Sequence, residues 1–160
     1  MLALAHTAQP AQPAQPEDFA DMCLAALEPG AEIIPLGLSP VSAGFPSPAE
    51  DYAEGGLNVH SYLVRNPVAT FFFPVRGDSM QGAGILDGDI LVVDRSVSPV
   101  DGHIVVAFVQ GERLVKRLRL RAGHMTLLAE NPAYPPLSIT EDTEHVLWGV
   151  VVGKFKRVPS

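Results

Sequence analysis

Residues 103–120, HIVVAFVQGERLVKRLRL, decide the fold of this chain. Two apolar runs rich in β-branched residues flank Gln110-Gly111, a pattern that predicts a hairpin of two strands. Side chains alternate between the two faces of a strand. One face of the second strand therefore collects four side chains: Leu114, Lys116, Leu118 and Leu120. Lys116 is the one charged residue on this otherwise apolar face.

Further apolar runs and Gly-containing turns surround the hairpin. Strands are predicted at residues 70–75, 89–94, 125–129 and 145–158, with a turn or short helical turn at 79–84. Residues 57–65 predict a short helix that ends before Asn66-Pro67. Many short strands joined by such turns indicate a compact, mostly β fold of antiparallel strands.

Three regions follow one another along the chain. Residues 1–30 are a Pro/Gln/Ala-rich lead, expected to be flexible, with a possible short helix at 17–28. Residues 31–48 contain four prolines among apolar residues and predict an extended arm. Residues 49–160 contain all the predicted strands and form the expected β-rich domain.

The composition is that of a globular protein of one domain. Of the 160 residues, 47% are hydrophobic and 18% are charged. A single cysteine, Cys23, excludes an intramolecular disulfide and fits a reducing compartment, so we expect a cytoplasmic protein. The sequence contains no run of about 18 apolar residues, which argues against a membrane span, and its start lacks the features of a signal peptide.

Charge and motifs narrow the function further. The formal net charge of −7 argues against strong direct binding of DNA. Basic clusters at residues 113–121 and 154–157 are interpreted as solvated strand faces, with contact to an acidic partner or the DNA backbone left open. The five histidines are scattered, and no P-loop or GxGxxG pattern occurs, so neither a metal site nor a cofactor is expected.

Ser79 and Lys116 are the candidate catalytic residues. Ser79 follows a predicted strand, in the turn Arg-Gly-Asp-Ser-Met at residues 76–80. A serine hydroxyl is a poor nucleophile until a base takes its proton, and a lysine whose pKa is lowered by burial can be that base. Taken singly, the serine motif is only a turn, and Lys116 could extend its ammonium to water.

The predicted turn also provides hydrogen-bond donors. The backbone amides of Ser79 and Asp78 are the expected donors to the oxyanion that forms when a carbonyl is attacked. Gly77 gives this turn conformational freedom. We interpret the Asp78 side chain as structural, because a Ser-Lys pair needs no acid to orient an imidazole.

From residue 33 to residue 158 the sequence resembles the UmuD proteins, which belong to the LexA-like self-cleaving serine peptidases. The matching stretches are AGFPSPAEDY at 43–52, GDSM at 77–80, DGDILVVD at 87–94, LVKRL at 114–118, NPAY at 131–134 and VLWGVV at 146–151. The resemblance implies that Ser79 is the nucleophile, that Lys116 is its base and that the bond cut is Ala43-Gly44. The chain departs from the family in having Ala43 where UmuD often has cysteine, and in its longer lead.

The resemblance also implies a role in the SOS response to DNA damage. A RecA filament on single-stranded DNA would stimulate cleavage, and the trimmed homodimer would be the accessory subunit of a UmuC-type Y-family translesion DNA polymerase. A LexA-like repressor is an alternative, although 43 residues before the bond leave little room for a helix-turn-helix. A binding module that has lost catalysis is another. Cleavage within one subunit or between two stays open.

Overall fold

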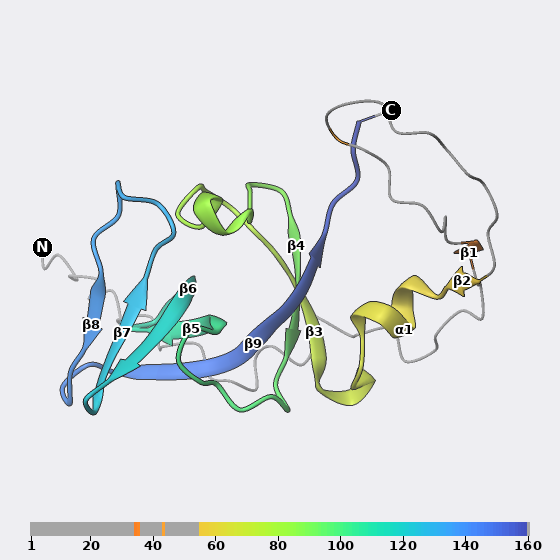
Figure 1. The fold of residues 1–160 in the computed structure, drawn as a ribbon. Coiled ribbons are helices and arrows are strands. Elements are labelled where there is room, and N and C mark those ends of the chain that lie inside the picture. The colour runs from red at the N-terminus through yellow and green to blue at the C-terminus, as the bar shows by residue number, and fades with distance from the viewer. Residues whose placement is uncertain (1–33, 36–42, 44–54, 160) are drawn as a thin grey trace, which may run out of the picture.

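A single antiparallel sheet forms the centre of the fold in the computed structural model, which describes residues 34–35, 43 and 55–159. Its seven strands lie in the spatial order β3-β4-β9-β5-β6-β7-β8 (Figure 1). Their bounds are Thr70–Pro74 (β3), Ile90–Asp94 (β4), Ile104–Val109 (β5), Glu112–Arg121 (β6), His124–Leu128 (β7), Leu137–Ile139 (β8) and His145–Phe155 (β9). All neighbouring strands are antiparallel, which confirms the predicted mostly β fold.

The hairpin predicted around Gln110-Gly111 is present as β5 and β6. Its register pairs Val109 with Glu112 across the Gln110-Gly111 turn. Both turn residues have positive φ angles, 51° and 81°, which is the backbone geometry of a tight turn matched to the twist of the strands. The following turn at Ala122-Gly123 repeats this geometry and leads into β7.

The helical segments are short. α1 (Val59–Leu63) begins after Asn58, whose side chain accepts a hydrogen bond from the Ser61 amide at 2.8 Å. The predicted helix at 57–65 was therefore too long at both ends. Two 3₁₀ turns, η2 (Pro67–Ala69) and η3 (Gln81–Ala83), flank β3, and η3 confirms the helical turn expected after Ser79.

A second, two-stranded sheet pairs β1 (Ile34–Pro35) with β2 (Gly56–Leu57) in antiparallel register. Neither strand was expected from the sequence. The possible helix at 17–28 and Cys23 lie outside the described residues. Among the helices that the structure describes, none is long and apolar enough to cross a membrane.

The long strand β9 bends as it passes between β4 and β5. Its register shifts against β4 between Val92 and Val93, and against β5 between Val106 and Ala107. Such bulges bend a strand and increase its twist. The curvature of β9 is visible in Figure 1, where the strand crosses the molecule from the side of β8 to the side of β3.

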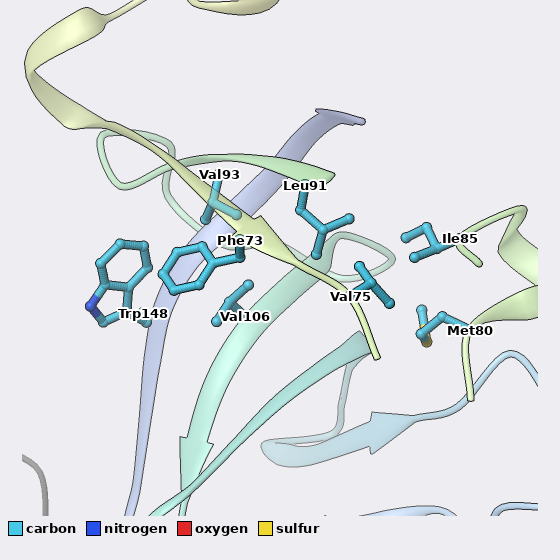
Figure 2. Packing of buried hydrophobic residues seen from close by; sticks show 8 residues of the cluster. All are labelled: Phe73, Val75, Met80, Ile85, Leu91, Val93, Val106 and Trp148. Carbon is cyan, nitrogen blue, oxygen red and sulfur yellow. The ribbon is translucent and has the colours of Figure 1, made fainter. Parts of the chain in front are cut away.

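Two hydrophobic clusters form the core on either side of this bent sheet. The first core cluster consists of Phe73, Val75, Met80, Ile85, Leu91, Val93, Val106 and Trp148 (Figure 2). The second consists of Val105, Ala107, Val109, Leu118, Leu127 and Val150. Met80 is only 1% exposed and belongs to the first core cluster, so the residue after Ser79 anchors the loop that follows β3.

The predicted alternation of faces in β6 needs one correction. Leu118 is buried, Lys116 is half-buried and Leu114 packs against the second core cluster, as expected for the apolar face. Leu120, however, is 39% exposed, because it lies near the end of the strand beyond the core. On the opposite face of β6, Val115 packs against the first core cluster.

Candidate active site

The fold brings Ser79 and Lys116 into direct contact. The Lys116 Nζ donates a hydrogen bond of 2.7 Å to the Ser79 Oγ, although the residues are 37 positions apart in the sequence. Ser79 lies in the turn after β3, and Lys116 lies in the middle of β6. Both side chains are half-buried. The pair has the arrangement that nucleophile and base require, in which the two reacting atoms are within hydrogen-bond distance.

Local contacts hold the turn of residues 76–80, here called the serine turn, in place. Gly77 has a φ of +90°, a conformation that side chains other than glycine rarely adopt, and its amide donates to the Asp87 Oδ1 at 2.8 Å. After Ser79, the chain enters η3 and ends it at Gly84 in the left-handed conformation. Ser79 therefore lies between the turn at Gly77 and a buried methionine, Met80.

The environment of Lys116 makes its amine easier to deprotonate than that of an ordinary lysine. Burial lowers the pKa of Lys116 below its ordinary value, because the charged form loses solvation. The aromatic ring of Tyr134 lies beside the amine, with its centroid 5.6 Å from Nζ. On the neighbouring strand, Lys116 is in register with the fully buried Val105.

The amides of Asp78 and Ser79 are the predicted oxyanion donors. Within the part of the chain that the structure describes, neither amide donates a hydrogen bond. The Asp78 carbonyl, by contrast, accepts from the Gln81 amide at 3.2 Å and from the Asn131 Nδ2 at 3.2 Å. An amide N–H can stabilise a tetrahedral oxyanion when it points at the oxygen on which the charge develops.

A cleft of about 470 Å³ opens beside the dyad. It lies between β3 with its following turn and the first half of β6. Its lining is mostly apolar with two arginines: Phe72, Phe73, Pro74, Val75, Arg76, Ser79, Leu91, Val106, Arg113, Leu114, Val115 and Lys116. The cleft has the size and the apolar walls of a binding site for a segment of extended chain.

Among the described strands, β6 has two neighbours. β7 pairs with β6 from Arg117 onward, where Arg117 faces Leu128. β5 pairs with the first half of β6, from Glu112 to Arg117.

The predicted cleavage site is only partly described. Ala43 lies in an exposed bend, and Gly44 lies outside the described residues. Ala43 is not among the described residues that line the cleft. The structure thus brings together the predicted nucleophile, base and oxyanion donors, while the predicted scissile bond extends beyond the described residues.

Sequence reasoning did not identify a group of residues after β7 that contacts the serine turn. The Glu130 amide donates to the Ser79 carbonyl at 2.9 Å, and the Tyr134 hydroxyl donates to the Asp78 Oδ1 at 2.5 Å. Asn131 is 7% exposed and touches Asp78 through its side chain. The only sequence signal for this group was the NPAY stretch at 131–134. It matches the UmuD proteins, but the sequence did not indicate what these residues do.

Comparison with known proteins places the dyad inside a matched region. A family model described as Peptidase S24-like matches residues 35–152. Protein MucA of Salmonella typhimurium is 50% identical over 119 residues, which cover 74% of this chain and 81% of that protein. Protein SamA of Salmonella typhimurium strain LT2 is 47% identical over 110 residues, 69% of this chain and 78% of that protein. LexA repressor of Acidithiobacillus ferrooxidans is 42% identical over 138 residues, 84% of this chain and 65% of that protein.

Proposed function

Because this chain belongs to the Peptidase S24-like family and, within it, to the UmuD family, we propose that its Ser79–Lys116 dyad cuts its own arm between Ala43 and Gly44. Its function is that of an SOS mutagenesis accessory protein. The single observation that supports the catalytic assignment is the 2.7 Å hydrogen bond between the Lys116 Nζ and the Ser79 Oγ.

The chemistry follows from that contact. The Ser79 Oγ attacks the carbonyl carbon of Ala43, and its proton passes to the neutral Lys116 amine. The carbonyl oxygen becomes an oxyanion, and the amides of Asp78 and Ser79 donate hydrogen bonds to it. The tetrahedral intermediate collapses, the Lys116 ammonium gives its proton to the Gly44 nitrogen, and the Ala43-Gly44 bond breaks. Water, deprotonated by the same lysine, then hydrolyses the Ala43 ester of Ser79.

Docking of the arm is a separate step from assembly of the dyad. The dyad is formed in the structure, while Ala43 is exposed and does not line the cleft among the described residues. Ala43 and Gly44 are small enough to enter a narrow cleft and to bend there. A RecA filament on single-stranded DNA would stimulate cleavage by favouring the docked arm.

The trimmed product, residues 44–160, would form a homodimer and join a UmuC-type Y-family polymerase. Support comes from large apolar side chains that are exposed on the described surface. They include Val59, Val68, Val146, Val152 and Phe155. Burying such side chains against a partner is favourable by roughly 25 cal/mol for each Å² of apolar surface.

Incubation of the purified chain with a RecA filament, single-stranded DNA and a nucleoside triphosphate tests the proposal. We expect the wild-type chain to be cut once, and Ser79→Ala and Lys116→Ala to stay intact while melting at temperatures close to that of the wild type. Cleavage of either variant at the wild-type rate would contradict the catalytic assignment. Sequence-specific binding of the uncut chain to an operator would instead favour the repressor alternative.

A further inference from the structure

The segment that follows β7 contacts both sides of the peptide bond that joins Asp78 to Ser79. Asn131 donates from Nδ2 to the Asp78 carbonyl at 3.2 Å and lies 3.4 Å from the Asp78 Oδ2. Tyr134 donates from its hydroxyl to the Asp78 Oδ1 at 2.5 Å. Asp78 is thus held at its carbonyl and at both carboxylate oxygens by residues more than fifty positions away.

The segment is itself firmly attached. The Glu130 amide donates to the Ser79 carbonyl, and the Glu130 carbonyl accepts from the Gly82 amide at 2.7 Å. Arg117 of β6 forms an ion pair with the Glu130 side chain. Asn131 is buried, and its Oδ1 accepts from the Ala133 amide at 3.0 Å, which fixes the orientation of the side-chain amide.

Holding the Asp78 carbonyl orients the proposed oxyanion donor. The described chain contains no cis peptide bonds, and in a trans peptide the N–H of Ser79 points opposite to the carbonyl of Asp78. The hydrogen bonds from Asn131 and Gln81 to that carbonyl therefore fix the direction of the Ser79 N–H. Fixed donors stabilise a developing oxyanion better than donors that must reorient.

The position of the Asp78 carboxylate affects the protonation state of the proposed base, Lys116. Asp78 is adjacent in sequence to the nucleophile, and the Ser79 Oγ is 2.7 Å from the Lys116 Nζ. A carboxylate within about 4–6 Å of a lysine favours the ammonium form, which cannot accept a proton. In the structure both Asp78 oxygens are instead turned to Asn131 and Tyr134.

We propose that Asn131 and Tyr134 are positioning residues of this peptidase. They orient the Asp78–Ser79 peptide as oxyanion donor and keep the Asp78 carboxylate from pairing with the Lys116 amine. This inference rests on the proposed function of the Ser79–Lys116 dyad. The other charged or titratable groups around Lys116 come from the turn, from β6 and from the segment after β7: Arg76, Arg113, Arg117 and Glu130. Of these, Glu130 is already paired with Arg117.

The Tyr134 hydroxyl is suited to alkaline conditions, where a lysine base is most active. Its hydrogen bond to Asp78, together with the negative charge of that carboxylate, raises the pKa of Tyr134 above its ordinary value. The phenol therefore stays protonated and continues to donate as the pH rises. The hydrogen bond to Asp78 therefore persists to higher pH than the ordinary pKa of a tyrosine would allow.

The test is the rate of self-cleavage without activator, measured against pH. Tyr134→Phe keeps the ring and removes the hydroxyl, so we expect its profile to move to higher pH by about one unit. Asp78→Asn removes the carboxylate, and the double variant Tyr134→Phe with Asp78→Asn should follow the Asp78→Asn profile without that shift. Tyr62→Phe, at an exposed tyrosine of α1, is the matched control and should follow the wild type.

The rate of self-cleavage of Asn131→Ala, measured at the same pH values, tests the second contact with Asp78 independently. Loss of its hydrogen bond to the Asp78 carbonyl should lower the rate between about tenfold and a hundredfold at every pH. A Tyr134→Phe profile that superimposes on the wild type, falls uniformly without a shift, or keeps its shift in the double variant would overturn the inference. A wild-type chain that is not cut at any pH would instead overturn the proposed function on which it rests.

Discussion

A half-buried lysine in the middle of β6 weakens the fold while it makes the proposed chemistry possible. Burial lowers the pKa of Lys116. Below that pKa the folded chain contains an ammonium group that has lost part of its solvation, which lowers the stability of the fold. Between the folded pKa and the unfolded value near 10.5, the unfolded chain binds more protons than the folded chain. The free energy of unfolding therefore rises with pH across this window.

Replacing this lysine should separate stability from activity. Lys116→Met removes the charge and keeps an unbranched apolar side chain, so we expect a higher midpoint of urea unfolding at pH 7 than in the wild type. The difference should shrink as the pH rises toward the ordinary pKa of lysine. Self-cleavage should fall by at least about a thousandfold, because the base is gone. A Lys116→Met midpoint below that of the wild type at pH 7 would contradict this account of Lys116.

At the scale of elements, η3 packs against the end of β7 at a position that only glycine can occupy. A Cβ on Gly82 would lie 2.5 Å from the Glu130 carbonyl oxygen, which is backbone and cannot rotate away. The same carbonyl accepts the Gly82 amide at 2.7 Å. The close approach joins the serine turn to the segment that holds Asp78.

Gly82→Ala should therefore disturb both stability and the site. We expect a loss of about 1–3 kcal/mol in the free energy of unfolding, together with slower self-cleavage, because η3 must move away from Glu130. Gly153→Ala is the control, since its Cβ would meet side-chain atoms rather than backbone, and its tightest contact would be the Leu63 Cδ2 at 3.2 Å, which can shift. The two variants are compared by urea unfolding and by their rates of self-cleavage. Equal losses in both variants would contradict the role given to the contact between Gly82 and Glu130.

The end of β9 is connected to the loop before β4 through a buried carboxylate. Asp89 is 2% exposed, and it accepts from the Lys154 Nζ at 2.7 Å and from the Leu86 amide at 2.9 Å. The hydrogen bond from Lys154 is the main cause that lowers the pKa of Asp89 below its ordinary value. A lowered carboxyl pKa stabilises the fold above the unfolded pKa, and this contribution is lost as the pH falls through the folded pKa.

Asp89→Asn should make the fold less sensitive to acid. At neutral pH we expect a loss of about 1.5–3 kcal/mol, the range for a hydrogen bond to a charged group. Below about pH 4 the wild type should lose stability faster than the variant, so the two unfolding midpoints converge. Asp142→Asn, at an exposed turn position before β9, serves as control. Wild-type and Asp89→Asn midpoints that fall in parallel with acid would exclude this role for Asp89.

At the scale of the whole molecule, local patterns predicted the strands well and the long-range contacts poorly. Alternation and turn residues located the β5–β6 hairpin and the strands around it. β8 escaped prediction, because three residues after Pro135-Pro136 give no periodicity to recognise. β9 ends at Phe155, three residues before the predicted end. Leu120 was expected on the apolar face and is exposed, because alternation does not show where the core ends.

The candidate site was predictable to a similar degree. Ser79 and Lys116 were recognisable because each is chemically unusual in its own short stretch, and the structure brings them to 2.7 Å. Asn131 and Tyr134 are ordinary turn residues locally. Their contacts with Asp78 span 53 and 56 positions, and only the folded sheet reveals them. The role of Ala43-Gly44 as the bond that is cut stays a prediction.

Intact mass spectrometry of the purified chain after incubation at about pH 10 tests the central claim most directly, because alkaline pH increases the neutral fraction of Lys116 without any activator. The account predicts two fragments, one ending at Ala43 and one starting at Gly44, that are absent in Ser79→Ala and Lys116→Ala. An intact wild-type chain, or the same fragments from either variant, would contradict it.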